Sequence, residues 1–139
     1  MPRTRVETRA RARVLQALYA WDLRGEQQLE RVATQIWDDL AIAPEERRLA
    51  GPLVRTIAKH GVELDAELAD VTTNWRLERL GVVDRCVLRL GAAELYQAET
   101  PPRVVIQEAV RLAERYGTVK SAKFVNGVLD ALARRMGRM

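Results

Sequence analysis

The chain has 139 residues, of which 47% are hydrophobic and 30% charged, so its size and composition predict one soluble globular domain. It has no run of about 18 apolar residues, which excludes a membrane-spanning helix, and its Arg-rich N-terminus lacks the apolar segment of a secretory signal, so we expect a cytoplasmic protein. The net charge of +4 is uneven, because residues 1–13 and 120–139 each carry +4 whereas residues 14–119 carry −4.

The predicted elements are all helical, since no stretch alternates apolar and polar residues for long enough to form a strand. A first helix is predicted over residues 5–24. Thr4 and Glu7 have capping-box spacing at its start, and Gly25 ends it. A second helix is predicted over residues 28–40.

Proline and glycine divide the rest of the chain. Pro44 is typical of the first position of a helix, because the missing N–H has no partner there in any case. We expect Gly51 and Pro52 to interrupt this helix before a longer run to residue 73. Further helices are predicted over residues 83–97, 103–117 and 119–136, after a short turn at residues 75–80. The sequence therefore predicts an all-α fold, a single compact bundle of about seven helices spanning residues 1–139.

Residues for catalysis or metal binding are scarce. His60 is the only histidine and Ser121 the only serine, which leaves little for a nucleophile and base. With Cys86 as the only cysteine, the chain cannot form a Cys/His zinc site of normal ligand spacing. Adjacent acidic pairs such as Glu45-Glu46 diverge around a helix and are interpreted as solvated surface. We expect a binding protein, not an enzyme, with no metal and no cofactor.

The first predicted helix has an apolar face and a basic face. At about 100° per residue, Val14, Leu15 and Leu18 share one face. The other face gathers Arg5, Arg9, Arg13 and Gln16, with Tyr19 at its edge. Cations, an amide and an aromatic ring are the groups that contact phosphates and unpaired bases, so this pattern favours nucleic-acid binding over a merely solvated face.

The last predicted helix contains the stretch SAKFVNGVLD. Its apolar stripe is Val125, Leu129, Leu132 and Met136, and Lys120, Lys123 and Gly127 lie opposite. Phe124 falls at the border. One interpretation is a half-exposed ring on which a base stacks, beside lysines and open backbone. The alternative is that Phe124 is a boundary core residue and Gly127 admits another helix.

Four segments in order resemble one known family. These are RARARVLQALYAWD, NWRLERLGVVDRCVLRLGAAEL, PPRVVIQEAVRLAERYG and SAKFVNGVLD. They are similar to the bacterial transcription antitermination protein NusB family over nearly the whole chain. The resemblance implies a helical fold without catalysis. It also implies binding of the single-stranded boxA RNA element of ribosomal RNA leaders jointly with NusE, a small-subunit ribosomal protein, in an RNA polymerase complex that suppresses premature termination.

The resemblance also implies site residues. Its RNA contacts correspond to Arg9, Arg11, Arg13, Gln16, Tyr19, Lys123 and Phe124. Arg11 falls nearer the apolar face of the helical wheel than the others. Lys120 stands where the family often varies and would add to the attraction for phosphates. Glu78 and Asp84 are candidates for contact with NusE.

Two other classes of function compete with RNA binding. A helix-turn-helix DNA-binding protein would use the turn at Gly117 and a second helix opening with Lys120, Ser121 and Lys123. Against it, this helix start is short of the Arg, Asn and Gln side chains that read base edges. A helical protein-interaction module is the other alternative, and the sequence leaves self-association as a homodimer open.

Overall fold

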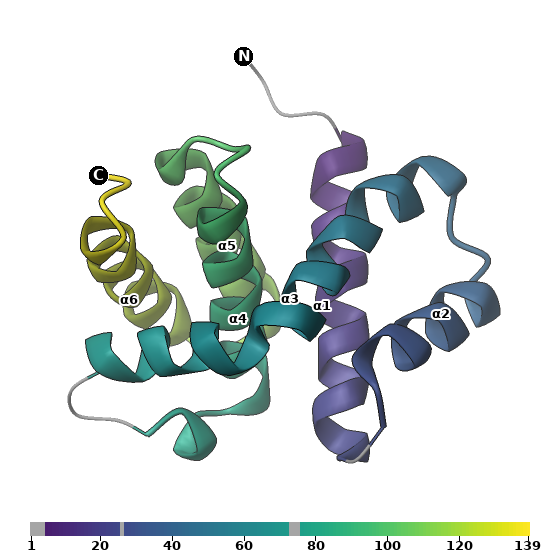
Figure 1. Cartoon of the computed structure of the whole chain (residues 1–139), viewed down its shortest axis with the longest axis horizontal. Helices are drawn as coiled ribbons and strands as arrows, with labels where there is room; N and C mark the ends of the chain where they lie inside the picture. Colours follow the sequence, from purple (N-terminus) through teal and green to yellow (C-terminus); the bar gives the residue numbers. More distant parts are fainter. Residues whose placement is uncertain (1–4, 26, 73–75) are drawn as a thin grey trace.

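The computed structural model describes residues 5–25, 27–72 and 76–139, with side chains from residue 6 onward. These residues form six α-helices and one short 3-10 helix, with no strand among them (Figure 1). The elements are α1 (Arg5–Arg24), α2 (Leu29–Asp39), α3 (Pro44–Val71), η1 (Leu77–Arg79), α4 (Val82–Gln97), α5 (Pro102–Tyr116) and α6 (Ser121–Arg135). The all-α prediction is confirmed. No helix in the described ranges is both long enough and apolar enough to cross a bilayer.

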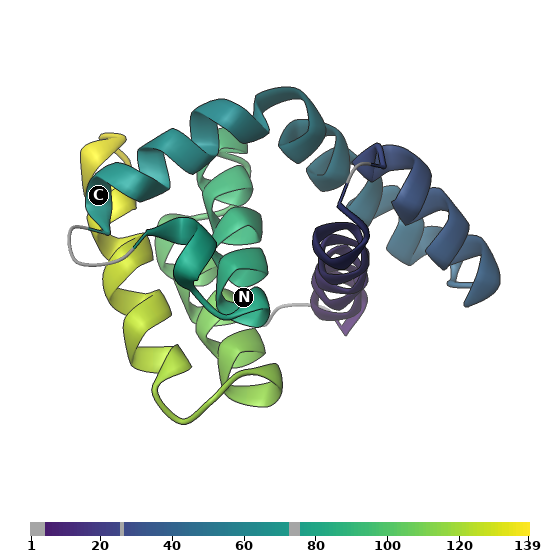
Figure 2. The same cartoon turned by 90° about the horizontal axis from the view of Figure 1, so that it is seen from below.

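One predicted boundary is wrong, which accounts for six helices in place of seven. Gly51 and Pro52 lie inside α3, which continues through them and is bent along its length (Figure 2). An interior proline costs a helix about 3 kcal/mol. Here Leu53 is buried in the core, and the side-chain amide of Gln97 donates to the Pro52 carbonyl at 3.2 Å. Tertiary packing therefore overrides the local preference for a break.

Other predicted helix ends are confirmed. The bounds of α1 match the expected residues 5–24, and Gly25 follows with a positive φ of 82°, the left-handed conformation common after a helix. Pro44 and Pro102 occupy first-turn positions of α3 and α5. The capping box predicted at Thr4 lies outside the described residues.

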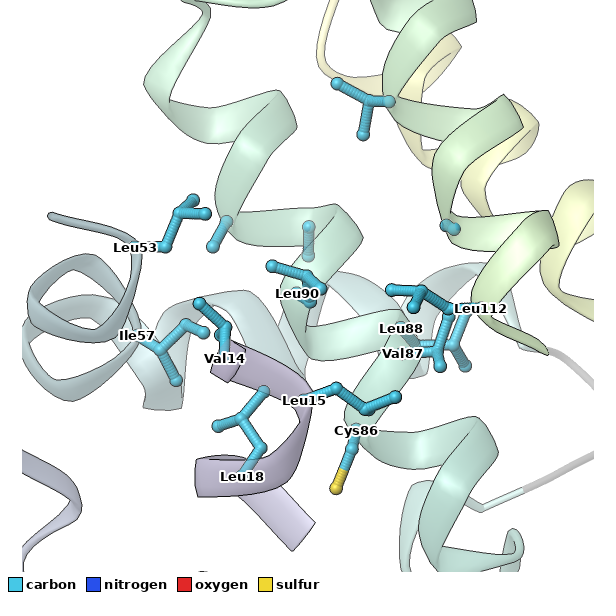
Figure 3. Packing of buried hydrophobic residues seen from close by; sticks show 14 of the residues in the cluster. Val14, Leu15, Leu18, Leu53, Ile57, Cys86, Val87, Leu88, Leu90 and Leu112 are labelled. Atoms are coloured by element: carbon cyan, nitrogen blue, oxygen red, sulfur yellow. The ribbon is translucent and has the colours of Figure 1, made fainter. Parts of the chain in front are cut away.

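The centre of the core is α4, which packs against α1, α3, α5 and α6. Figure 3 shows Val14 of α1, Ile57 of α3 and Leu90 of α4 pointing into the same interior, and all three are buried. The apolar face predicted for the last helix is confirmed, because Leu129 and Leu132 are fully buried. The long helix α3 contacts α1, α2, α4 and α6, so it spans the molecule (Figures 1 and 2).

A largely buried ionic cluster joins α1, α3 and α4. Asp22 accepts hydrogen bonds from Arg85 at 2.6 and 2.8 Å and from Arg89 at 3.0 Å. Arg89 also donates twice to Asp65, at 3.1 Å each. The hydrogen bonds from Arg85, together with those from Arg89, hold the pKa of Asp22 below its ordinary value although burial acts in the opposite direction. The cluster ties the end of α1 to the neighbouring helices.

Asp22 should make the stability of the protein depend on pH. Because its folded-state pKa lies below the unfolded value of 3.8, its contribution is present above that pH and is lost as pH falls through the folded-state pKa. We expect Asp22→Asn to lower the free energy of unfolding by roughly 1.5–3 kcal/mol at neutral pH. The difference from wild type should shrink below about pH 4.

Urea unfolding followed by circular dichroism from pH 7 downward measures this difference. Asp39→Asn, an exposed position at the end of α2, is the control for the substitution itself and should leave stability at neutral pH nearly unchanged. A constant gap between wild type and Asp22→Asn down to pH 3 would contradict the prediction.

Candidate nucleic-acid interface

The outward face of α1 is organised by a carboxylate from α3. Glu46 is only 5% exposed and accepts from the Nε of Arg9 at 2.9 Å and of Arg13 at 2.8 Å. The hydrogen bond from Arg13, followed by that from Arg9, lowers the pKa of Glu46 against the effect of burial. The expectation that Glu45 and Glu46 both belong to the solvated surface is therefore wrong for Glu46, since two guanidinium groups cover it.

This contact fixes the arginines while leaving them accessible. The Arg9 side chain is 50% exposed and that of Arg13 27%. A guanidinium has five N–H donors, and Glu46 takes the Nε donor of each, which orients the terminal amino groups. Arg13 Nη1 donates to Gln16 Oε1 at 3.2 Å, and Gln16 and Tyr19 are both exposed. The structure thus brings together four of the side chains predicted for this face.

The prediction that Arg11 belongs to the RNA-binding surface is wrong. It is 6% exposed and lies among Glu94 of α4 and Glu108 of α5, which are also buried. Its guanidinium donates to Glu94 at 2.9 Å through both Nε and Nη2, and Nη1 lies 3.4 Å from Glu108. Burial alone would lower the pKa of Arg11, but the hydrogen bond and charge of Glu94 and the charge of Glu108 raise it. Arg11 therefore lies on the core side of α1, in agreement with its place near the apolar face of the helical wheel.

The start of α6 carries the second group of predicted residues. Lys120 and Lys123 are exposed, and Phe124 is partly buried, packing against the core with part of its surface open. A Cβ built on Gly127 meets no atom within 4 Å, so this glycine does not make room for another helix of the chain. The interpretation that Gly127 makes room for another helix is therefore wrong within this chain. Phe124 both packs against the core and keeps part of its ring exposed, so it has features of each interpretation. The side chain of Arg5 lies outside the described residues.

The turn between α5 and α6 depends on two small residues. A Cβ on Gly117 would lie 2.6 Å from Ser121 Oγ and 2.8 Å from the Ala113 carbonyl oxygen, so only glycine fits. Ser121 Oγ is buried and accepts from the Thr118 backbone N–H at 2.9 Å. Ser121 therefore closes the turn, and this places Lys120 at its exposed edge.

Three residues of α5, which the sequence analysis missed, belong to the same surface. Arg111 and Arg115 are exposed, and the Arg115 guanidinium lies 5.3 Å from the centre of the Tyr116 ring, which is itself 45% exposed. With Arg9 of α1 they line one small pocket of about 90 Å³. The i, i+4 spacing of the two arginines, directly ahead of a tyrosine, is a local signal for this basic face, although residues 14–119 as a whole carry a net negative charge.

The candidate acidic residues for a protein partner lie in η1 and at the start of α4. Glu78 is exposed in η1, and Asp84 is partly buried in the first turn of α4. Val83, next to Asp84, lines a groove together with Tyr19 and Tyr116. Asp84 is therefore next in the chain to a residue of the groove between α1 and α5.

Metal-binding side chains do not gather in the described part of the chain. No group of three or more His, Cys, Asp or Glu there could hold a metal ion. Cys86 is fully buried, and burial raises the pKa of its thiol to about 12. Cys86 is therefore a packing residue of the core.

Comparison with known proteins shows the family of this chain. Residues 8–134 match the model of the NusB family. The chain belongs to the NusB family. A transcription antitermination protein NusB of Anaeromyxobacter dehalogenans (strain 2CP-1) is 45% identical over 129 residues, covering 91% of this chain and 89% of that protein. The family resemblance predicted from the four segments is confirmed.

Solved structures agree with this membership. NusB of T. maritima superimposes with a TM-score of 0.83 at 35% identity, covering 96% of this chain and 93% of that one. A chain from a complex of antitermination factors NusB and NusE with double-stranded RNA superimposes with a TM-score of 0.85 at 33% identity, covering 96% and 99%. The family is one of transcription antitermination factors, not of enzymes, as expected from the sequence.

Replacing the buried Arg11 should destabilise the protein more than replacing the exposed Arg9. Arg11→Ala leaves two buried carboxylates with one cationic partner fewer, so we expect a loss of about 3–5 kcal/mol in the free energy of unfolding. Arg9→Ala removes a half-exposed partner and should cost less than about 1 kcal/mol. Urea unfolding measures both, and equal losses would mean that Arg11 is not the structural residue its burial indicates.

Proposed function

We propose that this protein is a transcription antitermination factor that binds the single-stranded boxA RNA of ribosomal RNA leader transcripts together with NusE. In this proposal residues 1–139 act as one RNA-binding unit in the cytoplasm, within an antitermination complex of RNA polymerase. The observation that carries the proposal is the set of exposed cations and partly exposed aromatic rings on α1 and α5, which line two pockets together, with further exposed lysines and the Phe124 ring at the start of α6.

An unpaired strand suits this surface better than a stacked duplex. Arginine and lysine attract phosphates with little regard to sequence, and the attraction weakens with salt. Tyr19, Tyr116 and Phe124 offer ring faces, which reach a base only when it is unstacked. We therefore assign phosphate contacts to the cations Arg9, Arg13, Lys120 and Lys123, and base contacts to the rings and to Gln16. Arg11 is left out of this assignment because it is buried.

Two observations support NusE as the protein partner. A similar chain, named NusB, was crystallised with NusE and RNA. In this chain Glu78 is exposed and Asp84 is partly exposed in the first turn of α4, where their carboxylates would attract positively charged groups of a partner. A helix-turn-helix role is less favoured, since α6 packs against α3, α4 and α5 and its exposed start offers lysines in place of base-edge readers.

Fluorescence anisotropy with a short labelled boxA-like RNA tests the function directly. Single-stranded RNA, duplex RNA and duplex DNA of matched length are titrated across a salt series, with and without NusE. We expect the single strand to bind most tightly, more tightly still with NusE, and with an affinity that falls as salt rises. Preference for duplex DNA would instead support the helix-turn-helix alternative, and absence of binding to all three would leave a protein-interaction module.

The Phe124 ring should contribute to RNA binding by stacking on a base. We expect Phe124→Ala to weaken binding by about 1–3 kcal/mol. Because the ring is partly buried, the same substitution also removes core contacts. RNA binding and thermal unfolding are therefore measured on the same preparations.

Phe124→Leu separates the two contributions. Leucine retains most of the apolar packing but has no aromatic face, so it should preserve stability and still bind RNA weakly. If Phe124→Leu binds RNA like wild type while Phe124→Ala is unstable, the ring is a core residue and the stacking assignment is wrong.

A further inference from the structure

The two oxygens of the Glu46 carboxylate are divided between two arginines. Oε1 accepts from the Nε of Arg13 at 2.8 Å, and Oε2 accepts from the Nε of Arg9 at 2.9 Å. The Glu46 side chain is only 7% exposed, so its charge faces the two guanidinium groups and not the solvent. One buried group in the first turn of α3 therefore sets the direction of two cations on α1.

The surroundings of Arg13 are fixed at both ends of its side chain. The Trp37 indole of α2, which is buried, donates to the Arg13 carbonyl oxygen at 3.1 Å. At the outer end, Arg13 Nη1 donates to Gln16 Oε1 at 3.2 Å. This contact turns the amide oxygen of Gln16 toward Arg13, so the NH2 group is left as the donor for a ligand. Contacts from α2 and α3 thus determine the geometry of the polar groups on α1.

This arrangement reduces the charge of the α1 face and orders what remains. Arg9 and Arg13 each contribute a positive charge, and Glu46 offsets one of them. Attraction to any polyanion needs only the charges, since it depends on how many phosphates are neutralised and little on direction. Ordered guanidinium groups instead lower the entropy cost of a binding geometry that they already match. The buried carboxylate is therefore explained by selectivity and not by overall attraction.

We propose that Glu46 is a positioning residue that makes the basic face of α1 selective for its RNA over other polyanions. It acts through Arg9 and Arg13 and does not itself contact the RNA. Its two contacts hold the guanidinium groups at one separation, which suits one spacing of phosphates, whereas unheld side chains would adapt to many. The inference rests on the RNA binding proposed above and adds the residue that restricts this binding to one geometry.

Replacing Glu46 by glutamine tests the positioning role. An amide has a single acceptor oxygen, so Glu46→Gln can hold only one arginine Nε, and the face gains a positive charge. Fluorescence anisotropy compares boxA-like single-stranded RNA with duplex DNA of matched length. We expect duplex DNA to bind this variant more tightly than wild type. The ratio of RNA to DNA affinity should fall at least about 5-fold, the equivalent of ordering two side chains at ~0.5 kcal/mol each.

Glu46→Asp separates order from charge. It keeps the carboxylate but draws it back by about 1.5 Å, the length of one carbon–carbon bond, which breaks the contacts with both arginines. Duplex DNA should bind this variant as it binds wild type, and the ratio of RNA to DNA affinity should still fall. The exposed Glu45, next in the chain, provides the matched control. Glu45→Gln makes the same change of charge and should leave the ratio unchanged.

The Nε–H resonances of the arginines give an NMR readout that needs no RNA. In wild type, those of Arg9 and Arg13 should exchange with water more slowly than those of other exposed arginines, because both donate to Glu46. At least one should exchange faster in Glu46→Gln, and both in Glu46→Asp. Thermal unfolding checks that each variant is folded, and Glu46→Asp carries the test if Glu46→Gln is unfolded.

The outcomes separate the positioning role from the function as a whole. If the slow exchange is lost but the ratio of RNA to DNA affinity keeps its wild-type value, Glu46 is only a structural ion-pair partner and the inference is wrong. An equal fall of the ratio in Glu45→Gln would also overturn it, because charge alone would then explain the change. If wild type does not prefer boxA-like RNA to duplex DNA, the proposed function fails and the selectivity assigned to Glu46 fails with it, even where the resonances show ordered arginines.

Discussion

The buried contact of Arg11 with Glu94 and Glu108 determines how this surface is built. A guanidinium inside a protein must be paired, so α1 is held at the rotation that points Arg11 toward α4 and α5. Residues two positions away point about 200° around a helix. Arg9 and Arg13 therefore face outward, and the burial of one arginine is what exposes the other two.

The same contact brings α5 beside α1. Glu108 is near Arg11 on its buried side and pairs at 3.8 Å with the exposed Arg111. The cations and Tyr116 of α5 thereby join the basic face of α1, although about a hundred residues separate them in the chain. Glu46 plays a comparable part from α3. It neutralises some of the positive charge and fixes the direction of two guanidinium groups in return, which favours a preorganised surface over a merely basic one.

A surface of exposed cations and aromatic rings is suited to binding a polyanion. The long-range attraction of the cations and the short-range contact of the rings act on different parts of a nucleic acid, so the proposed binding of an unpaired strand needs both. Phe124 illustrates how closely structure and proposed binding are joined, because one ring both packs on the core and reaches the surface. Membership in a family of antitermination factors agrees with a chain whose chemistry is confined to contact.

The sequence by itself determined the all-helical fold, most helix ends and the core faces of α1 and α6, because periodicity and end signals are local. It also carried the family resemblance. Only the tertiary structure decided the rest. The helix α3 continues through Pro52 because Leu53 is held in the core. Glu46 is buried because two arginines of α1 cover it. Arg11 points inward because Glu94 of α4 and Glu108 of α5 pair with its guanidinium. Spacing set Arg11 near the apolar face of α1, but ion pairing between distant segments leaves no periodic trace, so spacing could not show that two carboxylates would pair with it in the core.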